Sequence, residues 1–222
     1  MPSLLRPTAS LAAEAILVGD PGRALLLAQE LLESPKMSNH ARGLWGYSGE
    51  TGAGRALTIQ STGVGGPSAA LVLADLVELG VRRAVRVGTC VGFEEAETGA
   101  LLSVGGAIAA GGSAAAQGAT AGETVLPDPA LTARLRRGLG EDAPTVTVAS
   151  VDAHPGEGPV PGGAIAADMQ TAPLLARARG LGIKAAALLI VAEAVGHEPI
   201  GKDALEAVEK RAGHLARAAL ST

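Results

Sequence analysis

Aromatic side chains are almost absent from this chain of 222 residues, which contains one Trp, one Tyr and one Phe. Hydrophobic residues still make up 47% of the sequence, so Ala, Val, Leu and Ile must supply most of the core. A pocket in such a protein has few rings on which a flat ligand can stack, which limits how a nucleobase could be held.

Cysteine, excess charge and long apolar runs are also scarce. Cys90 is the single cysteine, which excludes an internal disulfide framework and is typical of a reducing compartment. The formal net charge of −4 does not indicate a nucleic-acid surface. The apolar run 101–110 is too short to cross a bilayer as a helix, and Glu14 interrupts the N-terminal apolar stretch where a signal peptide would need continuity. We therefore expect a cytoplasmic protein that binds neither nucleic acid nor membrane.

Residues 61–68, Ser-Thr-Gly-Val-Gly-Gly-Pro-Ser, form the most distinctive stretch and lie between an apolar run and a helical pattern. Glycines let the backbone reach positive φ and approach a ligand closely. The helix that follows would offer free N–H groups to an anion or a sugar oxygen. The glycine spacing is neither that of a phosphate loop nor that of a dinucleotide-binding turn. A ligand-binding turn and a plain tight turn both remain open.

Strand-like apolar runs alternate with helical patterns along the whole chain. The clearest strands are 15–18, 84–90, 145–150 and 184–194, and the clearest helices are 24–32, 69–80, 128–139, 171–180 and 202–220. This alternation predicts an α/β fold with three layers, α/β/α, around a central mixed, mostly parallel sheet. No repeat or long linker divides the chain, so we expect residues 1–222 to form a single domain.

Two arginines are candidates for binding an anion. Arg86 lies inside the apolar run 84–90, and because burying an unpaired charge is costly, it must either be paired or reach an anion at the strand end. Thr89 follows it and offers a hydroxyl to the same ligand. Arg23 lies in the first turn of a helix, where a cation opposes the helix dipole. A solvated arginine and one that faces a bound anion are both compatible with that position.

Together these motifs resemble those of the nucleoside phosphorylase family, which includes uridine phosphorylase, hexameric purine nucleoside phosphorylase and methylthioadenosine nucleosidases. Residues 19–23, Gly-Asp-Pro-Gly-Arg, resemble the G-D-P-x-R loop of that family, and 61–68 is similar to its signature in a form nearer to uridine phosphorylases. Residues 86–89 resemble the strand end R-[VI]-G-[ST], and Arg42 with 46–49 resembles the second arginine segment. The second half of the chain matches in layout, with weaker motifs.

The resemblance implies a pentosyltransferase in which phosphate attacks the anomeric carbon of a nucleoside and the base departs. It implies a uridine-like nucleoside as the first choice and a purine nucleoside as the second, with inorganic phosphate as co-substrate and no cofactor or metal. Phosphate would be held by Gly19, Arg23, Arg86 and Thr89, and Arg42 would reach into the site of a neighbouring subunit. A two-fold dimer is then the minimum unit, and the family implies a hexamer. The arginine set favours phosphorolysis over hydrolysis.

The nucleoside end departs from the family pattern. Asp168-Met169-Gln170 stands where the family has E-M-E, so Met169 and Gln170, with Thr89, are expected at the ribose, but without the second carboxylate. Ala192-Glu193 stands where purine phosphorylases have S-D. Glu193 is expected to act as general acid if its pKa is raised, with Arg86 as the other catalytic residue. A solvated carboxylate at a strand end is the alternative.

The base is expected to contact Cys90, Val91 and His154. The aromatic residue that stacks on purines in the family corresponds to Ala153 here, and residues 150–164 show no Gln–Arg pair for uracil. Two other hypotheses therefore stay open: a non-catalytic nucleoside- or sugar-binding protein that retains the fold, and a nucleosidase that uses water.

Overall fold

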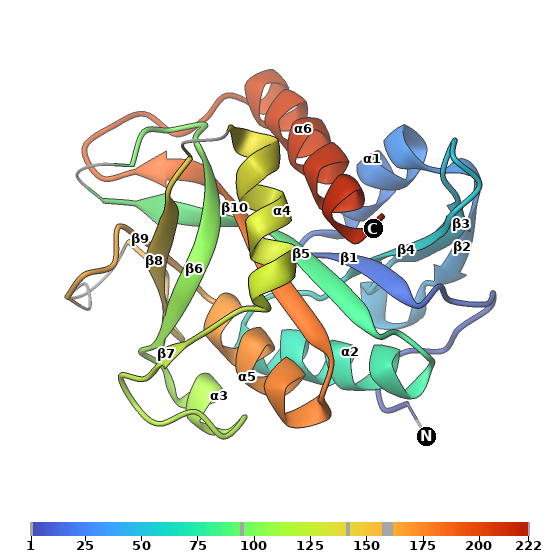
Figure 1. The fold of residues 1–222 in the computed structure, drawn as a ribbon, viewed down its shortest axis with the longest axis horizontal. Coiled ribbons are helices and arrows are strands. Elements are labelled where there is room, and N and C mark those ends of the chain that lie inside the picture. The colour runs from blue at the N-terminus through green and yellow to red at the C-terminus, as the bar shows by residue number, and fades with distance from the viewer. Residues whose placement is uncertain (1, 94–95, 141–142, 157–161, 222) are drawn as a thin grey trace.

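The computed structural model describes residues 2–93, 96–140, 143–156 and 162–221 (Figure 1). The helices are α1 (Pro21–Leu31), α2 (Gly66–Glu78), α3 (Gly112–Ala115), α4 (Pro129–Leu139), α5 (Thr171–Leu181) and α6 (Lys202–Leu220). The strands are β1 (Glu14–Val18), β2 (Glu33–Asn39), β3 (Gly46–Glu50), β4 (Ala56–Ser61), β5 (Arg83–Gly92), β6 (Leu101–Ala109), β7 (Thr124–Val125), β8 (Thr145–Ser150), β9 (Ala166–Asp168) and β10 (Lys184–Ala194). A 3-10 turn, η1, covers Ala41–Gly43.

The strands join one mixed sheet with β1 in its parallel centre. β1 pairs in parallel with β4 on one side and with β5 on the other, and β5 pairs in parallel with β10. Antiparallel pairing joins β2, β3 and β4 and also joins β6 to β10. The two kinds of pairing agree with the predicted mixed sheet. The turn 51–55 joins β3 and β4 as antiparallel neighbours, because short turns can join only antiparallel strands.

Half of the sheet closes on itself. β10 pairs with both β5 and β6, and the ring is completed through β8 and β9 back to β5. The carboxyl ends of β1, β5 and β10 lie at the same edge of the sheet, because these three strands run in parallel. That edge is where ligands bind in α/β sheets.

Helices cover both faces of the sheet, which confirms the three-layer α/β/α architecture (Figure 1). α1, α4 and α6 share one apolar cluster with Ile16 and Leu188. α2 and α5 share a second cluster with Leu17 and Leu189. Successive strand residues point to opposite faces, so neighbouring residues of β1 and β10 serve different clusters. In the part of the chain that the structure describes, no helix is long and apolar enough to span a membrane.

Asp75 on α2 binds the N-terminal segment through hydrogen bonds. Its carboxylate accepts hydrogen bonds from the backbone N–H groups of Ser3, Leu4 and Leu5 at 2.7, 2.6 and 2.9 Å. Burial opposes ionisation of this group, but the hydrogen bonds outweigh burial, so the pKa of Asp75 is lowered.

Candidate active site

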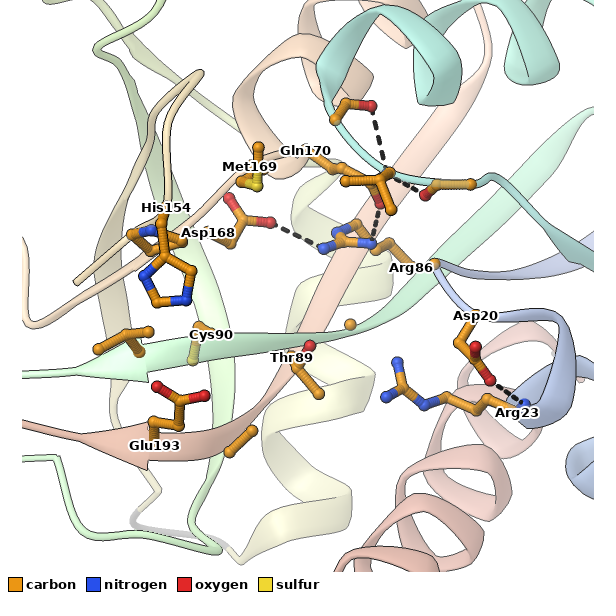
Figure 2. A pocket seen from close by; sticks show the side chains of 18 of the residues that line it. Asp20, Arg23, Arg86, Thr89, Cys90, His154, Asp168, Met169, Gln170 and Glu193 are labelled. Atoms are coloured by element: carbon orange, nitrogen blue, oxygen red, sulfur yellow. Dashed lines mark hydrogen bonds and ion pairs between the residues drawn. The ribbon is translucent and has the colours of Figure 1, made fainter. Parts of the chain in front are cut away.

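A pocket of about 410 Å³ lies at the edge where β1, β5 and β10 end (Figure 2). It is lined by the turn after β1, the glycine turn after β4, the second half of β5, the loop after β8, the β9–α5 junction and the end of β10. The lining residues expected from the sequence are Gly19, Arg23, Arg86, Thr89, Cys90, Val91, His154, Met169, Gln170 and Glu193. The fold therefore brings together the proposed site residues of five separate segments, and Arg42 alone of the expected set lies outside this pocket.

Arg86 is 4% exposed, and its guanidinium is paired within the chain. Nη2 lies 2.8 Å from Oδ2 of Asp168, and Nη1 donates to Oε1 of Gln170 at 2.6 Å. Nε donates to the Thr171 hydroxyl at 3.2 Å. The guanidinium lies so close to Gly88 that a Cβ there would collide with it, which explains the glycine at this point of β5. The sequence required Arg86 either to be paired within the chain or to reach an anion, and the structure shows that it is paired.

Arg23 is held by a partner that the sequence analysis did not identify. Asp20 caps α1 by accepting the N–H of Arg23 at 2.8 Å, which fixes the start of the helix. The Nε of Arg23 donates to Oε1 of Glu209 on α6 at 2.6 Å, and the two side chains are 8% and 11% exposed. Because the Nε–H of Arg23 is bound to Glu209, the two terminal nitrogens of the guanidinium are directed into the pocket toward Thr89 (Figure 2). The sequence feature that could have indicated this pairing is the position of Glu209 between Leu205 and Ala212 on the apolar face of the predicted helix.

The glycine turn has the backbone that its sequence predicts. Gly63 and Gly65 have φ values of +72° and +82°, and Gly65 precedes the first turn of α2, where Pro67 lies. The amide nitrogen of Gln170 donates to the carbonyl of Gly63 at 2.6 Å and to that of Gly65 at 3.2 Å. The turn is thus fixed against the β9–α5 junction and borders the pocket.

The far end of the pocket carries titratable side chains. His154 and Glu193 are exposed, and their side chains face one another across the pocket in Figure 2. Cys90 is buried, and its thiol donates to the carbonyl of Ile190 at 3.5 Å. Burial raises the pKa of Cys90, the charge of Asp168 raises it further, and that of Arg86 opposes them. The thiol therefore stays protonated and forms a neutral part of the wall.

Carboxylates balance the positive charge of the pocket. Asp168 pairs with Arg86, and Glu209 pairs with Arg23. An anion would gain less here than at two unpaired arginines. No three His, Cys, Asp or Glu side chains of the described ranges are grouped so that they could hold a metal ion.

Arg42 is presented outward. It lies in η1 with a φ of +59°, a left-handed conformation that is uncommon for a side chain with a Cβ, and it is exposed. It forms no hydrogen bond or ion pair with the residues that the structure describes. Of the two nearby aromatics, Trp45 is 36% exposed, whereas Tyr47 is 6% exposed and packs in the cluster with α1.

Comparison with known proteins agrees with this architecture. The sequence pattern of the phosphorylase superfamily matches residues 14–221. The DeoD-type purine nucleoside phosphorylase of Clostridium beijerinckii is 38% identical over 90 residues, which are 40% of this chain and 38% of that protein. The corresponding enzyme of Oceanobacillus iheyensis is 42% identical over 76 residues, which are 34% of this chain and 32% of that protein. The chain thus spans about a third of the length of these curated relatives in the alignments.

A solved structure shares the fold over nearly the whole chain. Uridine phosphorylase from Vibrio fischeri superimposes with a TM-score of 0.80 at 21% identity, covering 95% of this chain and 92% of that one. The chain has the nucleoside phosphorylase fold, and the match over residues 14–221 shows that it belongs to the phosphorylase superfamily.

Proposed function

We propose that this protein is a nucleoside phosphorylase that uses phosphate to cleave the N-glycosidic bond of a nucleoside, releasing the base and (deoxy)ribose 1-phosphate. The observation that carries the proposal is the meeting of Arg23, Arg86 and Thr89 at one pocket on the carboxyl edge of the sheet. Guanidinium groups match the geometry of phosphate, and the terminal nitrogens of Arg23 extend toward Thr89 (Figure 2). Membership of the phosphorylase superfamily supports the same reaction class.

The phosphate lies, in this proposal, against Gly19, Arg23, Arg86 and Thr89. The sugar lies next to it, against Thr89 and Met169, with Gln170 in the wall behind. As the glycosidic bond breaks, positive charge develops on the sugar, and the bound phosphate supplies the nearby negative charge that stabilises it. Phosphate is a co-substrate in this scheme, and no cofactor or metal takes part.

At the other end of the pocket, the base lies against Cys90, Val91 and His154, and Glu193 donates the proton that the departing base needs. An exposed carboxyl at the pocket wall can exchange protons with water between turnovers. We propose a uridine-like nucleoside as the first substrate and a purine nucleoside as the second, since the lining of the described part contains no Phe, Tyr or Trp ring that would favour the larger base.

Arg42 completes the site of a neighbouring subunit in this proposal. The arginines in the pocket are already paired with carboxylates, so a phosphate dianion needs a further positive charge, and Arg42 is exposed and without a partner among the described residues. A two-fold dimer is then the smallest active unit, and three such dimers would form a hexamer. We place the enzyme in the cytoplasm.

Subunit mixing tests the role of Arg42. Arg42→Ala and Arg23→Ala homodimers should each be nearly inactive, because every site lacks one arginine. A mixed dimer places both lesions in one site and leaves the other site whole, so activity should return on mixing under conditions of verified subunit exchange. Activity that does not return contradicts the exchange of Arg42 between subunits.

The reaction itself is tested by base release from a panel of purine and pyrimidine ribo- and deoxyribonucleosides, with and without phosphate. We expect release that requires phosphate, is lost in Arg23→Ala and is retained in Arg137→Ala, which changes an exposed arginine on α4. Equal release without phosphate would identify a nucleosidase instead.

The second candidate function is nucleoside or sugar binding without turnover. The paired state of Arg86 and the neutral amide of Gln170 favour it, because both lower the charge available to the reaction. Binding of a nucleoside by calorimetry without base release would establish it.

A further inference from the structure

Gln170 lies at the point where three parts of the pocket meet. It follows β9, directly precedes α5 and is 4% exposed. Its Oε1 accepts from Nη1 of Arg86 at 2.6 Å and lies 3.2 Å from the Thr62 hydroxyl. Its Nε2 donates to the carbonyls of Gly63 and Gly65. The side chain therefore links a buried arginine to the glycine turn.

The partners leave one orientation for the amide. Arginine has only donors, so the atom that faces Arg86 must be the oxygen. The carbonyls of Gly63 and Gly65 only accept, so the atom that faces them must be the NH2 group, and both of its hydrogens are used. The remaining lone pair of the oxygen faces Thr62. Both donors and one lone pair of this amide are therefore used within the chain. The second lone pair lies against the buried Thr62 hydroxyl, whose single hydrogen can also reach the carbonyl of Val18 at 3.0 Å.

The first glycine loop lies near the same amide. A Cβ on Gly19 would stand 3.7 Å from the carbonyl oxygen of Gly63 and 3.8 Å from Oε1 of Gln170. Gln170 thus lies close to both glycine-rich turns that border the pocket and is hydrogen-bonded to the second turn and to Arg86.

A glutamate cannot take over these contacts. Its second carboxylate oxygen would stand against the Gly63 carbonyl, where the amide now donates at 2.6 Å, and both hydrogen bonds to the turn would become repulsions. This gives a physical reason for glutamine at a position where the family resemblance leads one to expect a carboxylate that contacts the sugar.

We propose that Gln170 is a positioning residue, which fixes Arg86 and the glycine turn for phosphate and does not itself contact the nucleoside. The inference rests on the proposed phosphorylase function. It assigns Gln170 a different task from the ribose contact that the sequence led us to expect, and it predicts that changes at position 170 act on phosphate through Arg86.

The test separates the Michaelis constants of the two substrates. In Gln170→Met, which keeps the length of the side chain but not its hydrogen bonds, we expect the KM for phosphate to rise at least tenfold while the KM for the nucleoside changes less than threefold. Gln170→Glu should also raise the KM for phosphate and lower the melting temperature. Gln29→Met, an exposed glutamine on α1, should leave all three quantities unchanged.

The opposite pattern overturns the inference. If the nucleoside KM rises and the phosphate KM does not, Gln170 contacts the sugar. If Gln170→Glu folds normally and gains nucleoside kcat/KM, the position has room for a sugar-binding carboxylate.

Calorimetry with inorganic phosphate distinguishes a failure of the inference on Gln170 from a failure of the proposed phosphorylase function. A wild-type protein that binds phosphate but turns over no nucleoside refutes the phosphorylase proposal alone. The tenfold loss of phosphate affinity expected in Gln170→Met then still decides the role of Gln170. A wild-type protein that does not bind phosphate refutes both.

Discussion

Removal of the Glu209 carboxylate is the perturbation that the structure allows us to work out most fully. Glu209 accepts the Nε of Arg23 at 2.6 Å between two largely buried side chains on α6 and α1. Glu209→Ala would leave the guanidinium without its partner and free to rotate away from the pocket. Glu209→Gln would keep an oxygen at the same place, so the orientation of Arg23 should persist while the charge of the pair changes.

The expected magnitudes follow from the burial of the pair. Breaking a buried ion pair by removing one partner costs about 3–5 kcal/mol, and because the far side of Arg23 opens on the pocket, we expect the lower end, about 3 kcal/mol. For a chain of this size, that corresponds to a fall in melting temperature of roughly 6–12 °C. Loss of about 1.4 kcal/mol of phosphate binding would raise the KM for phosphate about tenfold. Glu209→Gln should lose only about 1 kcal/mol of stability, because one neutral acceptor remains.

Calorimetric unfolding and phosphate-dependent kinetics measure both effects. Glu206→Gln is the matched control, because Glu206 forms an exposed ion pair with Lys210 one turn away on the same helix. The reasoning is refuted if Glu209→Ala unfolds and binds phosphate like the wild type. If Glu209→Gln is as damaged as Glu209→Ala, charge and not geometry holds Arg23 in place.

Three further predictions concern the framework of the site. Gly88→Ala should displace the guanidinium of Arg86 and lower kcat/KM at least tenfold, with Gly180→Ala on α5 as a tolerated control, since no atom lies within 4 Å of a Cβ there; normal activity in Gly88→Ala would contradict the packing. Because the pKa of Asp75 is lowered in the folded state, its ionised form adds stability at pH values above about 4, and this stability is lost as the pH falls through the folded-state pKa. Asp75→Asn should therefore be less stable than the wild type by about 2 kcal/mol at pH 7 and lose less stability in acid. Parallel curves of stability against pH for the two proteins would refute this prediction. The raised pKa of Cys90 predicts that iodoacetamide at pH 8 labels the unfolded protein but not the native one, and rapid native labelling would show an accessible thiolate.

Local chemistry made much of the fold predictable. The predicted helix 128–139 is found as α4, which Asp128 caps and Pro129 begins, because capping depends on residues within one turn. β10 has the predicted bounds Lys184–Ala194, because a long apolar run needs burial on both faces. The expected pocket residues lie at one edge of the sheet, because most of them lie at or just after the ends of strands that the sequence predicted.

Contacts between distant residues could not be predicted in the same way. The pairing of β10 with both β5 and β6 closes the sheet, but no local pattern distinguishes a closing strand from an edge strand. Asp168 and Glu209 become partners of Arg86 and Arg23 across 82 and 186 positions of the chain. Such pairs are fixed by the packing of β9 and α6, which the sequence pattern does not specify.

The most direct test of the central claim is the fate of phosphate during turnover. We expect phosphorus NMR of the protein with its best nucleoside and one equivalent of inorganic phosphate to show a sugar 1-phosphate signal growing as the phosphate signal falls. One phosphate should be consumed for each base released, and Arg23→Ala should abolish both changes. Base release with the phosphate signal unchanged would contradict phosphorolysis and identify hydrolysis, and bound nucleoside with no base release would contradict catalysis altogether.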